Sequence, residues 1–375
     1  MAPRHGAPRF ELADIVRQYR AGLEQEVHLS PGQRRVLTDI GQCRTAKLGG
    51  HLDVCVACGY EHPSYNSCRN RHCPKCQALA QQKWIEQQRQ RLLDVPHFHV
   101  VFTLPAELRP LSAFAPDVVF GLLFTCAAAT LRAFGQRRLR AAIGATVVLH
   151  TWDKQLRFHP HVHAIVTGGG RRADGTWIST HQRFLFPVIA LSRVFRGKMC
   201  SALRDAYRNG SFNTFDDFED PEAIDRLLRN IARKNWHVYA KRSFDRAKHV
   251  VEYLGRYTHR VALSNSRLLL VSDSRVVIRT RGDGRAAMSC VELLRRFCRH
   301  VLPRGFHKIR HFGLYAGPNS STSACPTTRS THPLPTYAEH LRRLTGRDIT
   351  RCIRCGEPVR PRPLPAARSP PRRAA

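Results

Sequence analysis

Hydrophobic residues recur with a helical period near the start of the chain. The four apolar positions between Leu12 and Tyr19 follow the i, i+3, i+4, i+7 pattern of an amphipathic helix. Ser30 followed by Pro31 predicts the start of a second helix, because serine accepts hydrogen bonds from free N–H groups and proline suits the first turn. Residues 10 to 42 are therefore predicted to form a small helical module.

Further along, the chain alternates between strand and helix periods. Residues 97 to 104, 146 to 152 and 162 to 167 are rich in β-branched and aromatic residues and predict strands, of which the last two could pair antiparallel. Residues 116 to 143 predict apolar helices, and residues 224 to 231 predict an amphipathic one. No internal repeat is visible, so the pattern indicates a mixed α and β fold.

The hydrophobic pattern fails between Cys43 and Cys76, where Cys, His, Gly, Asn and Arg dominate. Burial of side chains alone would not fold such a segment. Cys55-x2-Cys58 and Cys73-x2-Cys76 are two close pairs, a layout that lets two knuckles meet at one tetrahedral zinc ion. Free buried cysteines or a redox pair would not explain so many Cys and His residues here. We expect these four thiolates to form one closed, structural zinc site.

Other potential ligands remain after this assignment. A second zinc centre could be formed by the residues of the same segment that are left over, namely Cys43, His51, Cys68 and His72. Near the chain's end, Cys352-x2-Cys355 supplies only half a zinc shell, and its partners stay open. Basic side chains between the cysteines are expected to contact DNA phosphates, and they are Arg69, Arg71 and Lys75.

Charge points to a polyanionic partner. The chain has 61 Lys and Arg against 28 Asp and Glu, a formal net charge of +33. Such a field attracts nucleic acid, although general basicity is an alternative explanation. The 13 cysteines cluster with histidines, which disfavours a secreted disulfide scaffold. No secretory leader or long apolar run is visible, so we expect a soluble intracellular protein without a membrane partner.

Histidines gather on one predicted strand. His159, His161 and His163 fall on one face of an extended segment, because side chains alternate along a strand. Neutral imidazoles bind divalent cations, and an incomplete shell leaves room for a phosphate oxygen that the metal polarises. His159 is the preferred third ligand, with Asp153 and Gln155 as alternatives. An isolated His-x-His pair is more often a packing feature, so a second signal is needed.

The second signal is a pair of tyrosines. Tyr253 and Tyr257 lie four residues apart in a predicted helix, so both phenols would share one face. Attack of a phenol on phosphorus gives a phosphotyrosine that conserves the bond energy for resealing. Arg256, Arg260 and Lys248 are candidates for stabilising the phenolate or binding substrate. Tyrosines at this spacing are alone more often part of a core stripe.

Taken in order, these motifs resemble the HUH (His-hydrophobic-His) superfamily of rolling-circle initiators and transposases. Residues 101 to 105 (VFTLP) are similar to its first strand motif, 160 to 163 (PHVH) to its metal motif, and Tyr253-x3-Tyr257 to its nucleophile motif. Within it, the likeness is to two-tyrosine rolling-circle insertion-sequence transposases, whose catalytic domain follows an N-terminal zinc-binding domain. Residues 66 to 77 and 308 to 313 are also similar to motifs of that group.

The resemblance implies an α+β fold, with a ferredoxin-like antiparallel sheet that carries helices on one side. Tyr253 or Tyr257 would attack a phosphodiester, giving a 5′-phosphotyrosine and a free 3′-OH, with Mg²⁺ or Mn²⁺ held by His161 and His163. Single-stranded transposon ends and target DNA would be the partners, in a bacterial cytoplasm at the nucleoid. No ATP site is expected, since no GxxxxGK[ST] motif is present.

Three domains are expected. Residues 1 to 92 would form the helical, zinc-binding DNA-docking domain, 93 to 316 the catalytic domain, and 317 to 375 a mobile Ser/Pro/Arg-rich tail with its CxxC knuckle. Two other functions remain open. One is a plasmid replication initiator or relaxase of the same superfamily, and the other is a non-catalytic, zinc-stabilised DNA-binding protein.

Overall fold

The computed structural model describes residues 9 to 181, 185 to 212, 220, 222 to 244, 255, 262 to 316 and 335 to 364. Five of the predicted catalytic and substrate-binding residues lie outside the described residues, namely Tyr253, Tyr257, Arg256, Arg260 and Lys248.

Two helices open the described chain, α1 (Leu12–Glu26) and α2 (Pro31–Gln42). The sequence predicted the start of α2 correctly. The Ser30 side chain accepts a hydrogen bond from the Gln33 backbone N–H, and the Gln33 side chain accepts one from Ser30. This capping box satisfies N–H groups that have no partner within the helix.

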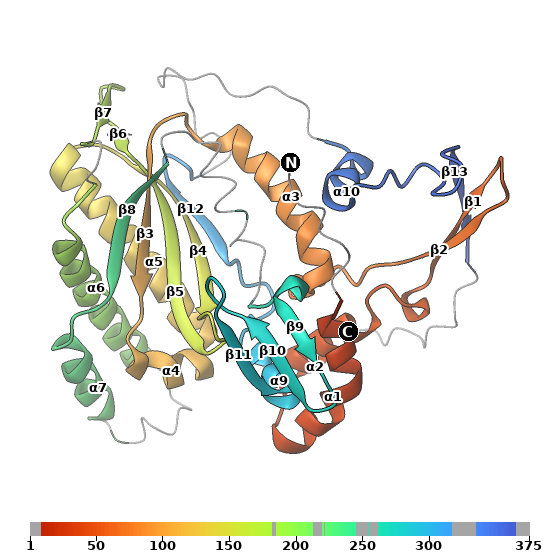
Figure 1. Cartoon of the computed structure of the whole chain (residues 1–375). Helices are drawn as coiled ribbons and strands as arrows, with labels where there is room; N and C mark the ends of the chain where they lie inside the picture. Colours follow the sequence, from red (N-terminus) through yellow and green to blue (C-terminus); the bar gives the residue numbers. More distant parts are fainter. Residues whose placement is uncertain are drawn as a thin grey trace.

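The apolar faces of α1 and α2 share a core with a segment more than 200 residues away in sequence. That core is formed with helix α9 (Cys290–Cys298) and a three-stranded antiparallel sheet in the order β11-β10-β9. The strands are β9 (Leu268–Val271), β10 (Arg275–Arg279) and β11 (Arg285–Ser289). The N-terminal helices therefore pack against residues that follow the tyrosine motif in sequence (Figure 1).

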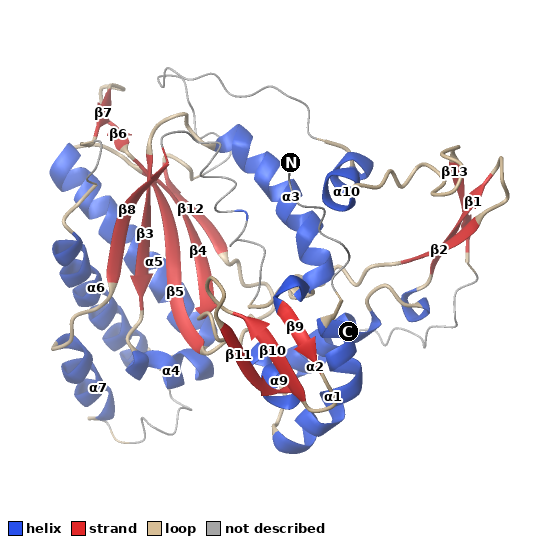
Figure 2. Cartoon of the chain, in the orientation of Figure 1, coloured by secondary structure: helices blue, strands red, loops and turns tan. Residues whose placement is uncertain are grey.

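A five-stranded antiparallel sheet forms the centre of the molecule (Figure 2). Its strands, in spatial order, are β12 (Ile309–Gly313), β4 (Gly144–Trp152), β5 (Phe158–Thr167), β3 (His97–Thr103) and β8 (Val238–Phe244). β4 and β5 pair antiparallel, as the sequence predicted. A short hairpin, β6 (Gly169–Arg171) with β7 (Trp177–Ser179), follows β5. The predicted α+β, ferredoxin-like antiparallel architecture is confirmed.

One face of the central sheet is the main hydrophobic core. Phe98, Val100 and Phe102 of β3 point into it with Val162 of β5, and all four are at most 2% exposed. The helices that cover this face are α4 (Arg109–Phe114), α5 (Pro116–Phe134), α6 (Val188–Arg208) and α7 (Ala223–Ala232). The stretch from 116 to 139 is long and apolar enough to cross a membrane, but half of it is buried and it packs into this core.

The opposite face of the sheet meets helix α3 (Pro74–Arg91), so helices cover both faces, whereas the resemblance implied helices on one side alone. Trp84 and Ile85 of α3 pack against Val148 of β4 and Ile165 of β5 in a separate cluster. α3 begins within the Cys-rich segment, so it links that segment to the sheet (Figure 1).

The remaining described elements form a small peripheral unit. A three-stranded sheet has the order β13-β1-β2, with strands β1 (Gly50–Cys55), β2 (Glu61–Tyr65) and β13 (Val359–Pro363). Helix α10 (Tyr337–Thr345) precedes β13 and contacts α3. The expected tail thus contains a structured part in residues 335 to 364, including helix α10.

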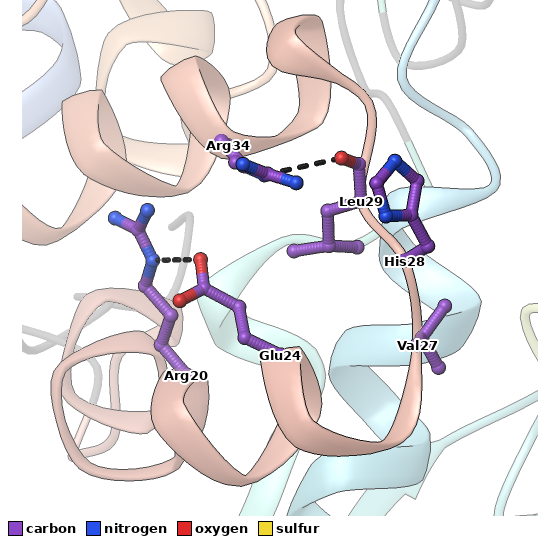
Figure 3. A pocket seen from close by; sticks show the side chains of 6 residues that line it. All are labelled: Arg20, Glu24, Val27, His28, Leu29 and Arg34. Atoms are coloured by element: carbon purple, nitrogen blue, oxygen red, sulfur yellow. Dashed lines mark hydrogen bonds and ion pairs between the residues drawn. The ribbon is translucent and has the colours of Figure 1, made fainter.

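A pocket of about 440 Å³ lies at the turn between α1 and α2 (Figure 3). Its lining residues are Arg20, Glu24, Val27, His28, Leu29 and Arg34. Arg20 pairs with Glu24 at 2.8 Å, and Arg34 donates to the Leu29 carbonyl at 3.1 Å. These charged groups stabilise the turn between the helices, and the pocket lies apart from the central sheet.

Candidate functional site

Three histidines converge on the face of the central sheet that is opposite the main core. Alternation along β5 directs Val162 into the core and His161 and His163 to the other face. His150 lies directly across from His161 in the β4–β5 register. Nitrogen atoms of His150, His161 and His163 all lie within 4.8 Å of one another, so these side chains could hold one metal ion.

His150 takes the place that was expected for His159. The structure does not place His159 in the cluster, because the third imidazole comes from the neighbouring strand, which spacing along β5 alone does not reveal. Nδ1 of His159 instead lies 3.3 Å from the Arg109 guanidinium, which donates to it. The His159 carbonyl does contribute, since it accepts a hydrogen bond from Nδ1 of His161 at 2.7 Å.

The two alternative ligands are also occupied elsewhere. The Asp153 carboxylate pairs with the Arg157 guanidinium at 2.6 Å and accepts backbone N–H groups of Gln155 and Arg157. Gln155 supplies its carbonyl to Arg296 at 3.0 Å. Both residues therefore shape the β4–β5 turn, and Asp153 does not belong to the histidine cluster.

The hydrogen bonds around the cluster set its tautomers. Because Nδ1 of His161 donates to a carbonyl, Nε2 carries the lone pair, and it lies 3.1 Å from Nε2 of His163. Nδ1 of His163 lies 2.7 Å from Nε2 of His99 on β3. With His163 donating to His99, both Nε2 lone pairs point at one place, which is the arrangement that a bound cation requires.

Burial keeps these imidazoles neutral. It lowers the pKa of His161 and of His99 to about 4. The pKa of His163 falls well below its usual value because of burial and the neighbouring His150. A neutral imidazole is the form that binds metals, so the site is ready for a cation near neutral pH.

One residue of the tyrosine motif is described, and it lies on this same side of the sheet. Gly255, between the two tyrosines in sequence, is buried. A Cβ atom on Gly255 would lie 2.3 Å from Cδ1 of Ile85, which is closer than carbon atoms can approach. A side chain at this position would require Ile85 or the backbone to shift, and Ile85 is held by packing with Ile165 on the histidine-bearing face.

Eight of the described cysteines form two sets of four, and neither is the set that the sequence predicted. Cys43, Cys68, Cys73 and Cys76 have their sulfur atoms within 4.8 Å of one another. The Cys43–Cys76 and Cys68–Cys76 distances are both 3.7 Å. Tetrahedral zinc with bonds of about 2.3 Å separates its sulfurs by about 3.8 Å. The geometry therefore fits one ion at the start of α3.

Thiol chemistry in this first set also favours a cation. Hydrogen bonds from Cys43, Cys68 and Cys73 lower the pKa of Cys76. The pKa values of Cys68 and Cys73 are raised in turn, mainly by Cys43. Four sulfurs this close can all ionise only if a positive charge lies between them.

The second set joins distant parts of the chain. Cys55 and Cys58 of the first CxxC pair lie with Cys352 and Cys355, whose partners the sequence left open. Spacing predicted the pairs correctly but assigned Cys55 and Cys58 to the wrong partners.

The two histidines proposed for a second zinc centre have other roles. His72 is buried, its Nε2 accepts the Leu302 backbone N–H at 3.1 Å, and its Nδ1 lies 3.1 Å from Asn70 Oδ1. Burial lowers the pKa of His72 to about 3. His51 on β1 pairs with Asp53 at 3.1 Å. Neither lies in a cysteine set, which corrects the expectation.

The three basic residues of the Cys-rich segment that were predicted to contact DNA lie in different surroundings. Arg71 donates to the carbonyls of Phe306 and Pro303 at 2.5 and 2.6 Å, so it ties this segment to the loop before β12. Lys75 pairs with Glu11 at 2.5 Å. Arg69 is exposed, with a positive φ of 54°. Of the three, Arg69 is placed best for a phosphate.

Comparison with known proteins identifies the family. Residues 144 to 323 match the family described as "Putative transposase", and residues 15 to 104 match the "Transposase zinc-binding domain". The "Putative transposase y4qJ" of Sinorhizobium fredii is 41% identical over 368 residues, which is 92% of each chain. The chain belongs to this transposase family.

A second relative agrees with this assignment. The transposase is 29% identical over 375 residues to the transposase for insertion sequence element IS801 of Pseudomonas savastanoi pv. phaseolicola. The alignment covers 95% of this chain and 90% of the relative. The predicted membership among insertion-sequence transposases with a zinc-binding domain is confirmed.

Solved structures offer a weaker likeness. The conjugative relaxase TrwC in complex with oriT DNA is similar over 43% of the transposase and 71% of its own chain, at 12% identity and a TM-score of 0.23. A metal-bound structure of the same relaxase complex gives the same TM-score. Likeness at this level carries no argument about function.

Proposed function

We propose that this transposase cuts and rejoins single DNA strands through 5′-phosphotyrosine intermediates, in rolling-circle-type transposition. The cluster of His150, His161 and His163 carries the proposal. Burial lowers the pKa values of His161 and His163, so both imidazoles are in the neutral form that binds a divalent cation.

The donor set fits a transition-metal ion better than Mg²⁺. Imidazole nitrogens suit first-row transition metals, whereas Mg²⁺ prefers oxygen ligands and water. His150, His161 and His163 would therefore hold Mn²⁺ or a similar ion. When bound, the cation would act as a Lewis acid on a phosphate oxygen. The protein's own contribution is to fix the imidazoles, through the His159 carbonyl and His99.

Tyr253 and Tyr257 are the proposed nucleophiles. The phenol oxygen of one tyrosine attacks the scissile phosphorus, and the bond from phosphorus to the 3′ oxygen breaks. The phenol proton is released, and the 3′ oxygen takes up a proton to become a free 3′-OH. One phosphodiester replaces another, so no ATP is required. The second tyrosine would repeat the step for strand transfer. Support comes from the sequence motif and from Gly255, which lies against α3 near the histidine-bearing face.

DNA binding follows from charge and from the Cys-rich segment. The net charge of +33 favours release of counterions from phosphates. We propose that a zinc ion stiffens the segment that presents Arg69 to DNA, and that the ion is held by Cys43, Cys68, Cys73 and Cys76. We also propose that three basic residues bind DNA near the tyrosines, namely Arg256, Arg260 and Lys248. The four cysteines of this zinc site lie within the region that matches the transposase zinc-binding domain.

The decisive test is formation of a covalent protein–DNA adduct. The purified chain would be incubated with Mn²⁺ and labelled single-stranded DNA from either side of its own gene, and the products separated on a denaturing gel. We expect an adduct that disappears in the Tyr253→Phe/Tyr257→Phe double variant and in His161→Ala. His159→Ala is the matched control, because its backbone carbonyl is retained, and it should still form the adduct.

Other outcomes would favour the alternatives. If the chain binds every such DNA tightly but forms no adduct, it is a zinc-stabilised DNA-binding protein without this chemistry. If adducts form equally well with strands unrelated to the element's ends, specificity for transposon ends is refuted. A relaxase or replication initiator would then be the better description.

A further inference from the structure

The hairpin near the N-terminus and the knuckle near the C-terminus have the same local structure. In Cys55-x2-Cys58-Gly59, the Gly59 N–H donates to the Cys55 carbonyl at 3.1 Å; in Cys352-x2-Cys355-Gly356, the Gly356 N–H donates to the Cys352 carbonyl at 3.0 Å. The two glycines have φ of 69° and 79°, the left-handed conformation that glycine adopts without strain. Each segment thus forms the tight turn of a zinc knuckle.

Strand pairing brings these two turns together. β1 pairs antiparallel with β13 from His51 opposite Pro363 to Cys55 opposite Val359. On its other edge β1 pairs with β2. Figure 1 shows β13, from the blue end of the chain, beside β1 and β2 from the orange region. The register sets both knuckles at the same end of the three-stranded sheet.

The sulfur atoms have the spacing of a zinc site. Cys55 and Cys355 are 3.4 Å apart, Cys58 and Cys355 are 3.5 Å apart, and Cys58 and Cys352 are 3.7 Å apart. Tetrahedral zinc places its sulfurs about 3.8 Å apart, whereas a disulfide bond is about 2.05 Å long. The Arg354 backbone N–H also approaches Cys352 Sγ, at 3.4 Å.

Side-chain burial does not account for this unit. The three hydrophobic clusters found among the described residues include no residue of β1, β2 or β13. Val56 and Ile353, the apolar residues within the two turns, are 66% and 63% exposed. By contrast, Cys55 and Cys352 are 1% and 5% exposed. A small sheet with buried cysteines and no apolar core is held together by metal in many small domains.

We propose that Cys55, Cys58, Cys352 and Cys355 bind a second structural zinc ion, forming one zinc ribbon from two halves at opposite ends of the chain. Cys58 and Cys352 are 294 residues apart in sequence. The matched zinc-binding region ends at residue 104, so half of this ribbon lies outside it. The proposal does not depend on the chemistry of DNA cleavage.

The ribbon would hold the C-terminal segment against the N-terminal module. Helix α10, which precedes the C-terminal knuckle, contacts α3 through an ion pair between Arg343 and Glu86 at 3.2 Å. Lys83 of α3 lies over the Tyr337 ring at 5.8 Å. These two exposed contacts are weak by themselves. Zinc in the ribbon would keep α10 and α3 together.

Zinc content of the purified full-length chain tests the proposal. Cys58→Ser and Cys352→Ser should each reduce zinc by one ion per chain, measured by mass spectrometry of the metal. The Cys58→Ser/Cys352→Ser double variant should lose one ion and no more, because both residues serve the same ion. Cys200→Ser is the matched control, a half-buried cysteine of α6 outside both sets, and it should lose none.

A conservative variant separates ligand loss from misfolding. Cys352→His supplies another zinc ligand and should restore the ion that Cys352→Ser loses. After replacement of zinc by Co²⁺, the sulfur-to-metal charge-transfer band should weaken in Cys352→His but persist. Full zinc content in Cys352→Ser, or loss of two ions in the double variant, would refute the shared site. Failure of Cys352→His to restore the ion would also count against it.

Discussion

Nε2 of His99 lies 2.7 Å from Nδ1 of His163, and the two rings are nearly parallel with their centroids 5.0 Å apart. His99 belongs to β3 and His163 to β5, so neighbouring strands of the central sheet fix this pair. His163 uses Nδ1 for this contact, and its Nε2 faces Nε2 of His161 at 3.1 Å. His99 is therefore a positioning residue for the proposed metal site.

Removing His99 should loosen metal binding. We expect His99→Ala to weaken Mn²⁺ binding by about 10- to 100-fold, as loss of an outer-shell partner of a metal ligand typically does. His99→Gln can still accept a hydrogen bond and should recover part of the loss. Calorimetric titration with Mn²⁺ measures both. Unchanged affinity in His99→Ala would show that His163 is oriented by something else.

His150 and His159 form a matched pair for locating the third ligand. His150→Ala removes an imidazole from the cluster, whereas His159→Ala leaves the carbonyl that orients His161. We expect the first change to reduce Mn²⁺ affinity by at least ~100-fold, beyond the usual outer-shell effect, and the second to alter it little. The same titration decides between them. A larger loss of Mn²⁺ affinity in His159→Ala than in His150→Ala would identify His159 as the third ligand.

The strand pattern predicted two of the three histidines in this cluster. Alternation along residues 159 to 163 correctly put His161 and His163 on one face, because a strand has a fixed period of two. It could not supply His150, which depends on the register between β4 and β5. That register is set by the turn at Asp153 and by side-chain packing, which local spacing does not encode.

For the cysteines too, local spacing predicted the pairs, whereas tertiary contacts decide how the pairs combine. Spacing identified Cys55 with Cys58 and Cys73 with Cys76, because a knuckle is a local structure. Which pairs share an ion depends on tertiary contacts, here the pairing of β1 with β13 and the packing around the start of α3. Capping signals, being local, were reliable, as Ser30 at the start of α2 shows.

Tyr315 should stabilise the fold through buried hydrogen bonds, including a long one at 3.4 Å that its hydroxyl accepts from the Leu93 backbone N–H. Its side chain is 1% exposed and its hydroxyl lies 2.8 Å from Nε2 of His97. Tyr315→Phe keeps the ring but leaves that nitrogen without this partner, at a cost of about 1 to 3 kcal/mol in the free energy of unfolding. Tyr337→Phe, at a 53% exposed tyrosine, should change it by less than ~0.5 kcal/mol. Urea denaturation measures both variants, and equal values would contradict the assignment.

His300 should make stability depend on pH. It is fully buried, donates to the Leu156 carbonyl at 3.1 Å and lies 3.1 Å from the Thr151 hydroxyl. Burial lowers its pKa from 6.5 to about 4, although the hydrogen bond to the Leu156 carbonyl and the charge of Asp153 act in the opposite direction. As the pH falls, His300 therefore becomes protonated near pH 6.5 in the unfolded chain but only near pH 4 in the folded chain. Stability is highest above pH 6.5 and falls as the pH drops through this window.

The size of this effect can be isolated by substitution. A shift of this size corresponds to a loss on the order of 3 kcal/mol between pH 7 and pH 4. His300→Gln cannot be protonated, so its unfolding free energy should fall less steeply over the same range. Denaturation curves at several pH values give both slopes. Parallel slopes would mean that other buried histidines account for the pH dependence.

Gly255 should be required for DNA cleavage because of its closeness to α3. A Cβ atom there would lie 2.3 and 2.4 Å from Cδ1 and Cγ1 of Ile85, a side chain that is 6% exposed and has little room to move. Gly255→Ala should therefore shift the segment that carries both tyrosines. Displacement of a reacting group by about 1 Å can cost up to ~100-fold in rate. We expect adduct formation to fall by a factor of this order, with zinc content and Mn²⁺ affinity unchanged.

A double variant distinguishes this close contact from a general effect of the substitution. Ile85→Ala removes both atoms that the new methyl group would meet, although it lowers stability by itself. If the contact is the cause, Gly255→Ala should reduce the rate of adduct formation much less in the Ile85→Ala background than in the wild type. Equal reductions in both backgrounds would mean that the packing of Gly255 on α3 does not position the tyrosines. A smaller reduction in the Ile85→Ala background would show that contact with α3, the helix that begins at the first cysteine set, positions the tyrosines for cleavage.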